Sequence, residues 1–274
     1  MNHGGDSEWM ALLAGGAAGG SLGALFGPIL APPGAADGCM LVGRLAQTLD
    51  GRIATRGGVS QWIGGAGDLR HTHRLRALCD AVVVGGGTVA ADDPLLTTRL
   101  VPGPNPLRVV LDTEARLPVG HKLFQAGPAT LLVVAQDRAF GHAPGPTPGP
   151  TPGPTPGPTP GRLHGLAEVL ALPRGADGRL DLTALVGALA ARGCRKIFIE
   201  GGGVTVSRFL MAGLLDRLHV TIAPIILGSG RPAFALPEAQ SIADGLRFGW
   251  TMHDIAPDML CDIALNRARP PLCR

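Results

Sequence analysis

Two clusters of three glycines carry the side chains best suited to chemistry in this sequence. Gly85–Gly87 ends an apolar run and is followed by Thr88 and Asp92, whereas Gly201–Gly203 follows Glu200. Glycine lets a ligand approach the backbone closely, and a neighbouring carboxylate can accept hydrogen bonds or transfer a proton. Both clusters are therefore candidate walls of a ligand site.

The first cluster fits a loose dinucleotide-binding motif, Gly85-x-Gly87-x-x-Ala90. A Rossmann phosphate loop, however, needs a helix of several turns after the glycines. Pro94 limits a helix that starts at Thr88 to about one and a half turns at 3.6 residues each. Without that helix the next acid, Asp112, cannot take the place of a ribose-binding residue, so a Rossmann fold is not expected.

The second cluster is the better phosphate cradle. A helical segment without prolines follows the glycines and carries Thr205, Ser207 and Arg208 in its first turns. Backbone N–H groups at a helix start bind anions, and glycine lets a phosphate come close. A tight strand-to-helix turn without a ligand is the structural alternative.

Apolar runs alternate with helical patterns along most of the chain. This alternation predicts an α/β fold, with a mostly parallel sheet covered by helices on both faces. The runs around a Pro-Asp turn in 247–265 predict an antiparallel C-terminal hairpin at the sheet edge. The predicted strands are 39–46, 80–85, 107–112, 130–135, 167–172, 195–200 and 217–224, and the predicted helices are 67–79, 181–193 and 203–215. Both glycine clusters then lie at carboxyl ends of parallel strands, where such a sheet has its ligand cleft. That cleft suits a cofactor together with a phosphorylated small molecule.

Composition and missing motifs exclude several classes of protein. The near balance of 24 Lys and Arg against 21 Asp and Glu gives no basic face for nucleic acid. The absence of tyrosine excludes the short-chain dehydrogenases, and the motifs of P-loop ATPases, serine hydrolases and zinc proteases are missing. Five scattered cysteines without metal-ligand spacing predict reduced thiols in a cytoplasmic protein. His71-x-His73 directs its rings to different sides of a helix, so no metal is expected.

Two segments lie outside the expected core. Residues 1–38 are a Gly/Ala-rich N-terminal extension, and residues 39–274 form one domain. The uncharged stretch 9–36 contains seven glycines and three prolines, which argues against a membrane span. We expect instead a flexible lead-in with a short helix at 7–15 that packs Trp9 on the domain. The PGPT repeats of 144–159 predict a disordered insertion at about 141–161.

Four stretches together resemble the reductase domain of the riboflavin-biosynthesis deaminase/reductase family. They are GRLAQTLDGRIATRGGVSQWI, RLRALCDAVVVGGGTVAADDPLLTTR, LRVVLD and IFIEGGGVTVSRFLMAGLLDRLHVTIAPIILG, and the resemblance spans about residues 39–265. It implies a dihydrofolate reductase-like three-layer fold and a homodimer. The implied reaction is NADPH-dependent reduction of 5-amino-6-(5-phosphoribosylamino)uracil to 5-amino-6-(5-phosphoribitylamino)uracil, by hydride transfer to ribose C1′. The protein would mainly hold the donor and acceptor carbons together and exclude water.

The resemblance also implies roles for individual residues. Arg76 and Arg99 would grip the ribose phosphate, Glu200 would accept hydrogen bonds from substrate, and either Glu200 or Asp92 would supply the balancing proton. The implied substrate contacts are Ser60, Arg76, Leu96, Arg99 and Glu200. The implied cofactor contacts are Ala46, Trp62, Thr88, Asp92, Thr113, Gly202, Gly203, Val204, Thr205, Val206, Ser207 and Arg208. The structural alternatives are a solvated helix face for Arg76, a surface charge for Arg99 and a core anchor for Trp62.

One departure from the bifunctional members of this family bears on function. The H-x-E and P-C-x-x-C zinc ligands of their deaminase domain are absent, so the sequence is similar to stand-alone reductases. Two alternatives stay open: an NADPH-dependent reductase of a related pterin or pyrimidine, and a non-catalytic dinucleotide-binding protein. Arg76 and Arg99 favour a phosphorylated substrate over a pterin, which has no phosphate.

Overall fold

The computed structural model describes residues 3–15, 19–61, 63–139, 163–265 and 267. The predicted PGPT insertion and Trp62 lie outside the described residues. The strands are β1 (Met40–Thr48), β2 (Arg52–Ala54), β3 (Ala81–Gly85), β4 (Leu107–Leu111), β5 (Thr130–Ala135), β6 (Leu163–His164), β7 (Ala167–Leu172), β8 (Lys196–Glu200), β9 (Arg217–Ala223), β10 (Arg231–Pro232), β11 (Trp250–Ile255) and β12 (Asp258–Ala264). The helices are α1 (His3–Leu13), α2 (Gly20–Leu30), α3 (Ala66–Leu78), α4 (Gly86–Asp92), α5 (Gln136–Ala139), α6 (Leu182–Ala191) and α7 (Gly203–Met211), with 3-10 turns η1 (Lys122–Phe124) and η2 (Ile242–Asp244).

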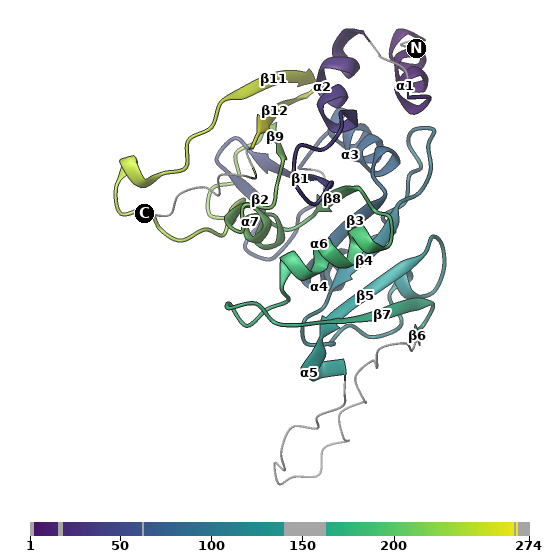
Figure 1. The fold of residues 1–274 in the computed structure, drawn as a ribbon. Helices are drawn as coiled ribbons and strands as arrows, with labels where there is room; N and C mark the ends of the chain where they lie inside the picture. The colour runs from purple at the N-terminus through teal and green to yellow at the C-terminus, as the bar shows by residue number, and fades with distance from the viewer. Residues whose placement is uncertain (1–2, 16–18, 62, 140–162, 266, 268–274) are drawn as a thin grey trace.

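The described strands form one large sheet in the order β11-β12-β9-β1-β8-β3-β4-β5-β7-β6, while β2 pairs with β10 (Figure 1). The seven strands from β9 to β7 are parallel to one another, and the short edge strand β6 is antiparallel to β7. The β11–β12 hairpin is antiparallel, and β12 runs antiparallel to β9. Both the mostly parallel sheet and the C-terminal hairpin predicted from sequence are confirmed.

The core lies in two layers, one on each face of the sheet. Successive side chains of a strand point to opposite faces, so Leu41 and Ile197 join one buried cluster while Val42 and Phe198 join the other. Helices α6 and α7 contribute to the first cluster, and α1, α2 and α3 contribute to the second. This arrangement of helices, sheet and helices is the expected three-layer fold, and it explains why the central strands are apolar throughout.

Two local predictions need correction. Helix α7 ends at Met211, four residues before the predicted end, because Gly213 takes a left-handed backbone (φ 64°) that stops the helix. The expected flexible lead-in instead contains two helices, α1 and α2 (Figure 1). Helix α1 matches the expected short helix, and its Trp9 is buried. Helix α2 was not predicted because its glycines and Pro28 are poor helix formers, but burial of its apolar side chains outweighs that preference.

Helices α1 and α2 are joined by a polar contact as well as by packing. The Glu8 carboxylate of α1 accepts hydrogen bonds from the backbone N–H groups of Leu22 and Gly23, at 2.9 and 3.0 Å. A carboxylate at this end of α2 satisfies N–H groups that have no partner within the helix. In the described part of the chain, no helix is long and apolar enough to cross a membrane.

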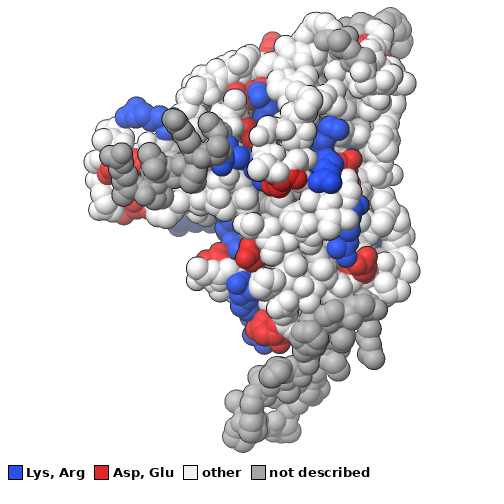
Figure 2. Space-filling view, in the orientation of Figure 1, with Lys and Arg blue, Asp and Glu red and all other residues white. Residues whose placement is uncertain are grey.

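Charged side chains on the face drawn in Figure 2 lie in small clusters of both signs. Charges of opposite sign also pair directly in the structure, for example Arg174 with Glu114 and Arg192 with Glu168. The described residues of that face form no continuous basic patch. On this face the charge of the described residues is therefore locally neutralised, in line with the near balance of charges in the sequence.

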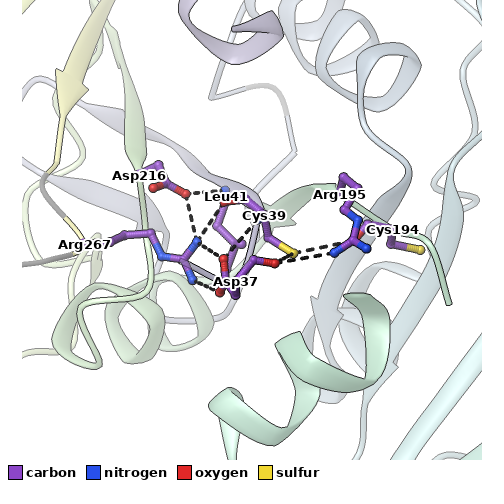
Figure 3. Close-up of polar contacts among 7 residues, drawn as sticks. All are labelled: Asp37, Cys39, Leu41, Cys194, Arg195, Asp216 and Arg267. Carbon is purple, nitrogen blue, oxygen red and sulfur yellow. Dashed lines mark hydrogen bonds and ion pairs between the residues drawn. The ribbon is translucent and has the colours of Figure 1, made fainter. Parts of the chain in front are cut away.

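A charged cluster ties the chain together at the amino ends of β1 and β8 (Figure 3). Arg267 donates to Asp37 at 2.5 Å, to the Cys39 carbonyl at 2.9 Å and to Asp216 at 3.3 Å. Asp216 also accepts from the backbone N–H of Leu41 at 2.7 Å. Burial raises the pKa of the Asp216 carboxyl, and Arg267 offsets part of that rise. The cluster fixes the start of β1 to the segment that leads into β9.

We expect Arg267→Ala to lower stability without lowering activity. The substitution leaves the Asp216 carboxylate without its cation and should cost about 1–3 kcal/mol of the free energy of unfolding. Urea unfolding measures this loss, and turnover at a temperature where both proteins are folded should be unchanged. Unchanged stability would show that the cluster contributes little.

Candidate active site

The two glycine clusters meet, as the sequence predicts. Strands β3 and β8 are parallel neighbours with Val83 opposite Ile199, so both turns lie at one edge of the sheet. The backbone N–H of Gly202 donates to Thr88 Oγ1 at 3.3 Å. A Cβ atom on Gly85 would lie 2.5 Å from Thr205 Oγ1, so a larger residue at this position would force the Thr205 side chain to shift. Helix α4 between the turns has seven residues, as Pro94 requires.

A cavity of about 1150 Å³ opens at this edge. It lies between the two turns, the end of β1, residues 58–61 and 63–69, and the β2–β10 pair. The predicted site residues that line it are Ala46, Ser60, Thr88, Asp92, Leu96, Arg99, Thr113, Glu200, Gly202, Gly203, Val204, Thr205 and Arg208. Residues grouped into one site from the sequence therefore do lie around one cavity in the fold. The role of each residue stays a prediction.

Two predicted cofactor contacts have side chains that point away from the cavity. Val206 is fully buried in the core cluster beneath α7. Ser207 is also buried, and its hydroxyl accepts from the backbone N–H of Ala235 at 2.9 Å. Only backbone atoms of these two residues are candidates for contact with a ligand, because helix periodicity turns their side chains inward.

Arg76 lies behind Glu200 rather than at the cavity surface. Its Nε and Nη2 donate to the two oxygens of Glu200 at 2.8 and 2.5 Å, and its Nη1 donates to the Thr97 carbonyl at 3.0 Å. Arg76 is only 7% exposed, so the alternative of a solvated basic face is wrong. With its three nitrogens engaged, Arg76 holds Glu200 and the Thr97 backbone in place. The predicted grip of Arg76 on a phosphate does not match this geometry.

The segment that carries Leu96 and Arg99 is also held in place by hydrogen bonds from the sheet. Leu96 is buried with a left-handed backbone (φ 52°), and Arg99 is exposed at the cavity. Arg108, nearly inaccessible in β4, donates to the carbonyl of Leu95 at 3.4 Å and to the carbonyls of Leu123, Ala126 and Pro128. Such backbone contacts position loop residues that have no strand or helix of their own.

His73 of α3 supports the same segment through its ring. Its Nδ1 accepts from the backbone N–H groups of Arg99 and Leu100 at 3.0 and 3.4 Å. Burial, reinforced by the charges of Arg76 and Arg99 and opposed by Glu200, lowers the pKa of His73 to about 4. The neutral ring is therefore the form that holds this loop.

We expect acid to destabilise the protein partly through His73. Its pKa is lower in the folded chain than the usual 6.5, so its contribution is complete above pH 6.5 and is lost as the pH falls toward 4. The contribution is at most about 3 kcal/mol. In His73→Asn, the Oδ1 atom can accept the same hydrogen bonds without titrating. Urea unfolding between pH 7 and 4 should show a shallower loss of stability for this variant, and parallel losses would contradict the role of His73.

Several cavity residues escaped the prediction from sequence. Arg44 of β1 pairs with Asp68 of α3, and Asp68 accepts from the Thr221 hydroxyl at 2.7 Å. A charged residue inside the otherwise apolar run of β1 was a usable signal for Arg44. Arg179 and Arg231 reach the cavity from loop and β10 positions that carry no such signal. In the described ranges, no three His, Cys, Asp or Glu side chains are arranged to hold a metal.

The start of α7 fits the phosphates of a dinucleotide. The first turn of a helix leaves N–H groups without intrahelical partners, and here that turn lines the cavity from Gly202 to Thr205. A Cβ atom on Gly87 would meet no atom within 4 Å, which leaves the facing turn open to a ligand. Three exposed arginines, Arg99, Arg179 and Arg231, add positive charge around the cavity. Two phosphorylated ligands are compatible with this set of residues.

This chain is similar to known proteins of one family. The family described as RibD C-terminal domain matches residues 40–253. The 2,5-diamino-6-ribosylamino-4(3H)-pyrimidinone 5′-phosphate reductase of Methanothermobacter thermautotrophicus is 38% identical over 208 residues, or 74% of this chain and 86% of that protein. The riboflavin biosynthesis protein RibD of Synechocystis sp. is 32% identical over 68% of this chain and 45% of that protein. The solved RibD structure of Acinetobacter baumannii has a TM-score of 0.66 and 25% identity, over 83% of this chain and 58% of that one. The chain thus spans about half the length of these RibD proteins, and the fold implied by the resemblance is confirmed.

Proposed function

Because the chain belongs to the RibD C-terminal domain family, we propose that it is a reductase of riboflavin biosynthesis that uses NADPH to reduce a phosphorylated ribosylaminopyrimidine. One observation carries the proposal. A single cavity at the carboxyl ends of the strands joins a phosphate cradle at α7 to the carboxylate of Glu200 and to exposed arginines. A nicotinamide dinucleotide and a phosphorylated second ligand fit these two halves.

The reaction requires that two carbons be held together away from water. Opening of the ribosylamine ring gives a C1′=N imine, to which a hydride adds at C1′ and a proton adds at nitrogen, giving the ribitylamine. The bound dinucleotide supplies the hydride. The protein therefore has to orient the substrate and admit one proton.

Glu200 is suited to orient the substrate. Arg76 fixes both its oxygens, and their remaining lone pairs can accept hydrogen bonds from sugar hydroxyls or ring N–H groups. Asp92 is exposed and lies 3.5 Å from the Ser60 hydroxyl. Of the two predicted proton donors, Asp92 is the better placed to exchange a proton with solvent.

Two related pyrimidines are the candidate substrates. The M. thermautotrophicus relative is named for the diaminopyrimidinone, whereas 5-amino-6-(5-phosphoribosylamino)uracil has an oxo group in place of one amino group. We propose the uracil as substrate and the diaminopyrimidinone as the alternative. Either carries the phosphate that the exposed arginines favour, unlike a pterin.

The test is loss of NADPH absorbance when the purified protein meets each pyrimidine, with mass spectrometry of the product. We expect one of the two pyrimidines to be turned over to a product that contains two more hydrogens. The same assay with NADH measures the preference for NADPH. Tight NADPH binding without turnover of either pyrimidine would reject the proposed substrate and favour another heterocycle or a non-catalytic dinucleotide-binding protein.

We also propose a homodimer in the cytoplasm. An apolar cavity of about 1020 Å³ opens beside the β11–β12 hairpin, where Trp250 is 65% exposed. Exposed apolar surface of this kind is typical of subunit contacts. The four described cysteines are free and buried, as expected in a reducing compartment. Sedimentation of the purified protein measures the oligomeric state.

A further inference from the structure

We propose that helices α1 and α2 are a positioning element for the substrate side of the cavity. These helices lie outside residues 40–253, which match the family. They contact two of the segments that carry predicted substrate residues: α3, which holds Arg76, and the loop of residues 94–106, which holds Leu96 and Arg99 and which we call the substrate loop. The inference rests on the proposed function for the identity of the ligand, but not for the contacts.

One face of α3 packs against the two N-terminal helices. His71 stacks on Phe26 of α2 with ring centroids 5.4 Å apart. The Arg74 guanidinium lies 5.5 Å from the ring centre of Trp9 in α1. Residues 71, 74, 75 and 78 have the spacing of one helix face, and Leu75 and Leu78 share the buried cluster of Trp9 and Phe26. The position of α3 on the sheet therefore depends on α1 and α2.

The other face of α3 holds the site. Arg76 binds Glu200 and the Thr97 carbonyl, and His73 binds the backbone N–H of Arg99. A shift of α3 would thus move Glu200, the substrate loop and the Arg99 side chain together. Because hydrogen bonds weaken steeply with distance and angle, a small shift is enough to loosen them.

Helix α1 also contacts the substrate loop directly. The Trp9 indole N–H donates to the Pro102 carbonyl at 2.9 Å. A Cβ atom on Gly103 would lie 2.5 Å from Ala77 of α3 and 3.6 Å from Leu13 of α1, so the loop is wedged between the two helices. Trp9, only 2% exposed, therefore joins α1, α3 and the substrate loop at one point.

The phosphate cradle has a different support. Val206, Phe209 and Leu210 of α7 belong to the buried cluster on the opposite face of the sheet. Loss of the Trp9 contacts should consequently weaken substrate binding while NADPH binding is retained. This selectivity separates a positioning role from general stabilisation.

The test compares Trp9→Ala with three other variants. Trp9→Phe keeps most of the packing but removes the hydrogen bond to Pro102. Met10→Ala changes an exposed side chain of the same helix. Leu189→Ala opens a cavity in the opposite cluster and lowers overall stability. Hydrogen exchange of the ligand-free proteins and the kinetic constants of each variant are measured.

For Trp9→Ala we expect faster exchange of amides in the substrate loop and in α3, and a substrate KM raised about tenfold. The Kd for NADPH should stay within about twofold. Trp9→Phe should fall between Trp9→Ala and the wild type, and Met10→Ala should match the wild type. If exchange is unchanged in Trp9→Ala, or if Leu189→Ala raises loop exchange and KM equally, the positioning role is rejected.

The two proposals fail in different ways. Hydrogen exchange of the ligand-free protein needs no substrate, so it tests the positioning role of α1 and α2 even if neither pyrimidine is reduced. If the wild type turns over substrate but Trp9→Ala leaves hydrogen exchange and KM unchanged, the positioning role is rejected and the proposed reaction is unaffected.

Discussion

Replacing Glu200 with Gln should lower kcat/KM by about 10²- to 10³-fold while the chain stays folded. The carboxylate accepts two hydrogen bonds from Arg76 in a pair whose side chains are 8% and 14% exposed. A Gln side chain offers one acceptor, and its NH₂ group would face a guanidinium N–H. Arg76 then remains as a buried cation without a counter-ion, at a cost of about 3–4 kcal/mol. Steady-state kinetics and thermal unfolding of both proteins measure the loss.

A matched control comes from Glu168, which pairs with Arg192 at the surface with side chains 57% and 33% exposed. Glu168→Gln makes the same chemical change where solvent screens the charge, so its effect should be below about 1 kcal/mol with unchanged kinetics. If Glu200→Gln kept more than about a third of wild-type kcat/KM, the Arg76–Glu200 pair would not matter for the reaction.

The sequence predicted those parts of the site that depend on neighbours along the chain. Apolar runs ending in glycines gave β3 and β8 with their turns, and Pro94 gave the short α4. Parallel strands then require both turns to meet at one edge. Thr88 and Gly202, although 114 positions apart, are indeed joined by a hydrogen bond.

Contacts that depend on packing across the fold were not predictable in this way. Arg76 in RHTHRLR has the local pattern of a solvated basic face, and only the placement of α3 over β8 reveals its partner 124 positions away. Helix α2 has poor local propensity, and its burial became evident only with the face of α3 that it covers. Local sequence patterns determine individual helices and strands, whereas the partners of charged side chains become evident only once the layers of the fold are assembled.

Replacing Gly203 with Ala should abolish most NADPH binding, with a Kd raised about 100-fold or more. A Cβ atom at this position would collide with the carbonyl oxygen of Ala233. The backbone around that carbonyl is held in place, because the Ala233 N–H donates to the Gly51 carbonyl at 3.0 Å and the Ala235 N–H donates to the Ser207 hydroxyl. The first turn of α7 must therefore move, and the proposed phosphate cradle moves with it. Overpacking of this kind also costs about 1–3 kcal/mol of stability.

Gly187→Ala is the control for this change. Gly187 lies exposed in α6, and a Cβ atom there would meet nothing within 4 Å. This substitution should leave the Kd unchanged and stabilise the helix by up to about 1 kcal/mol. Fluorescence titration with NADPH and urea unfolding of both variants separate the two effects. Should Gly203→Ala bind NADPH like the wild type, the phosphates would have to lie elsewhere in the cavity, because the shifted helix start could not hold them unchanged.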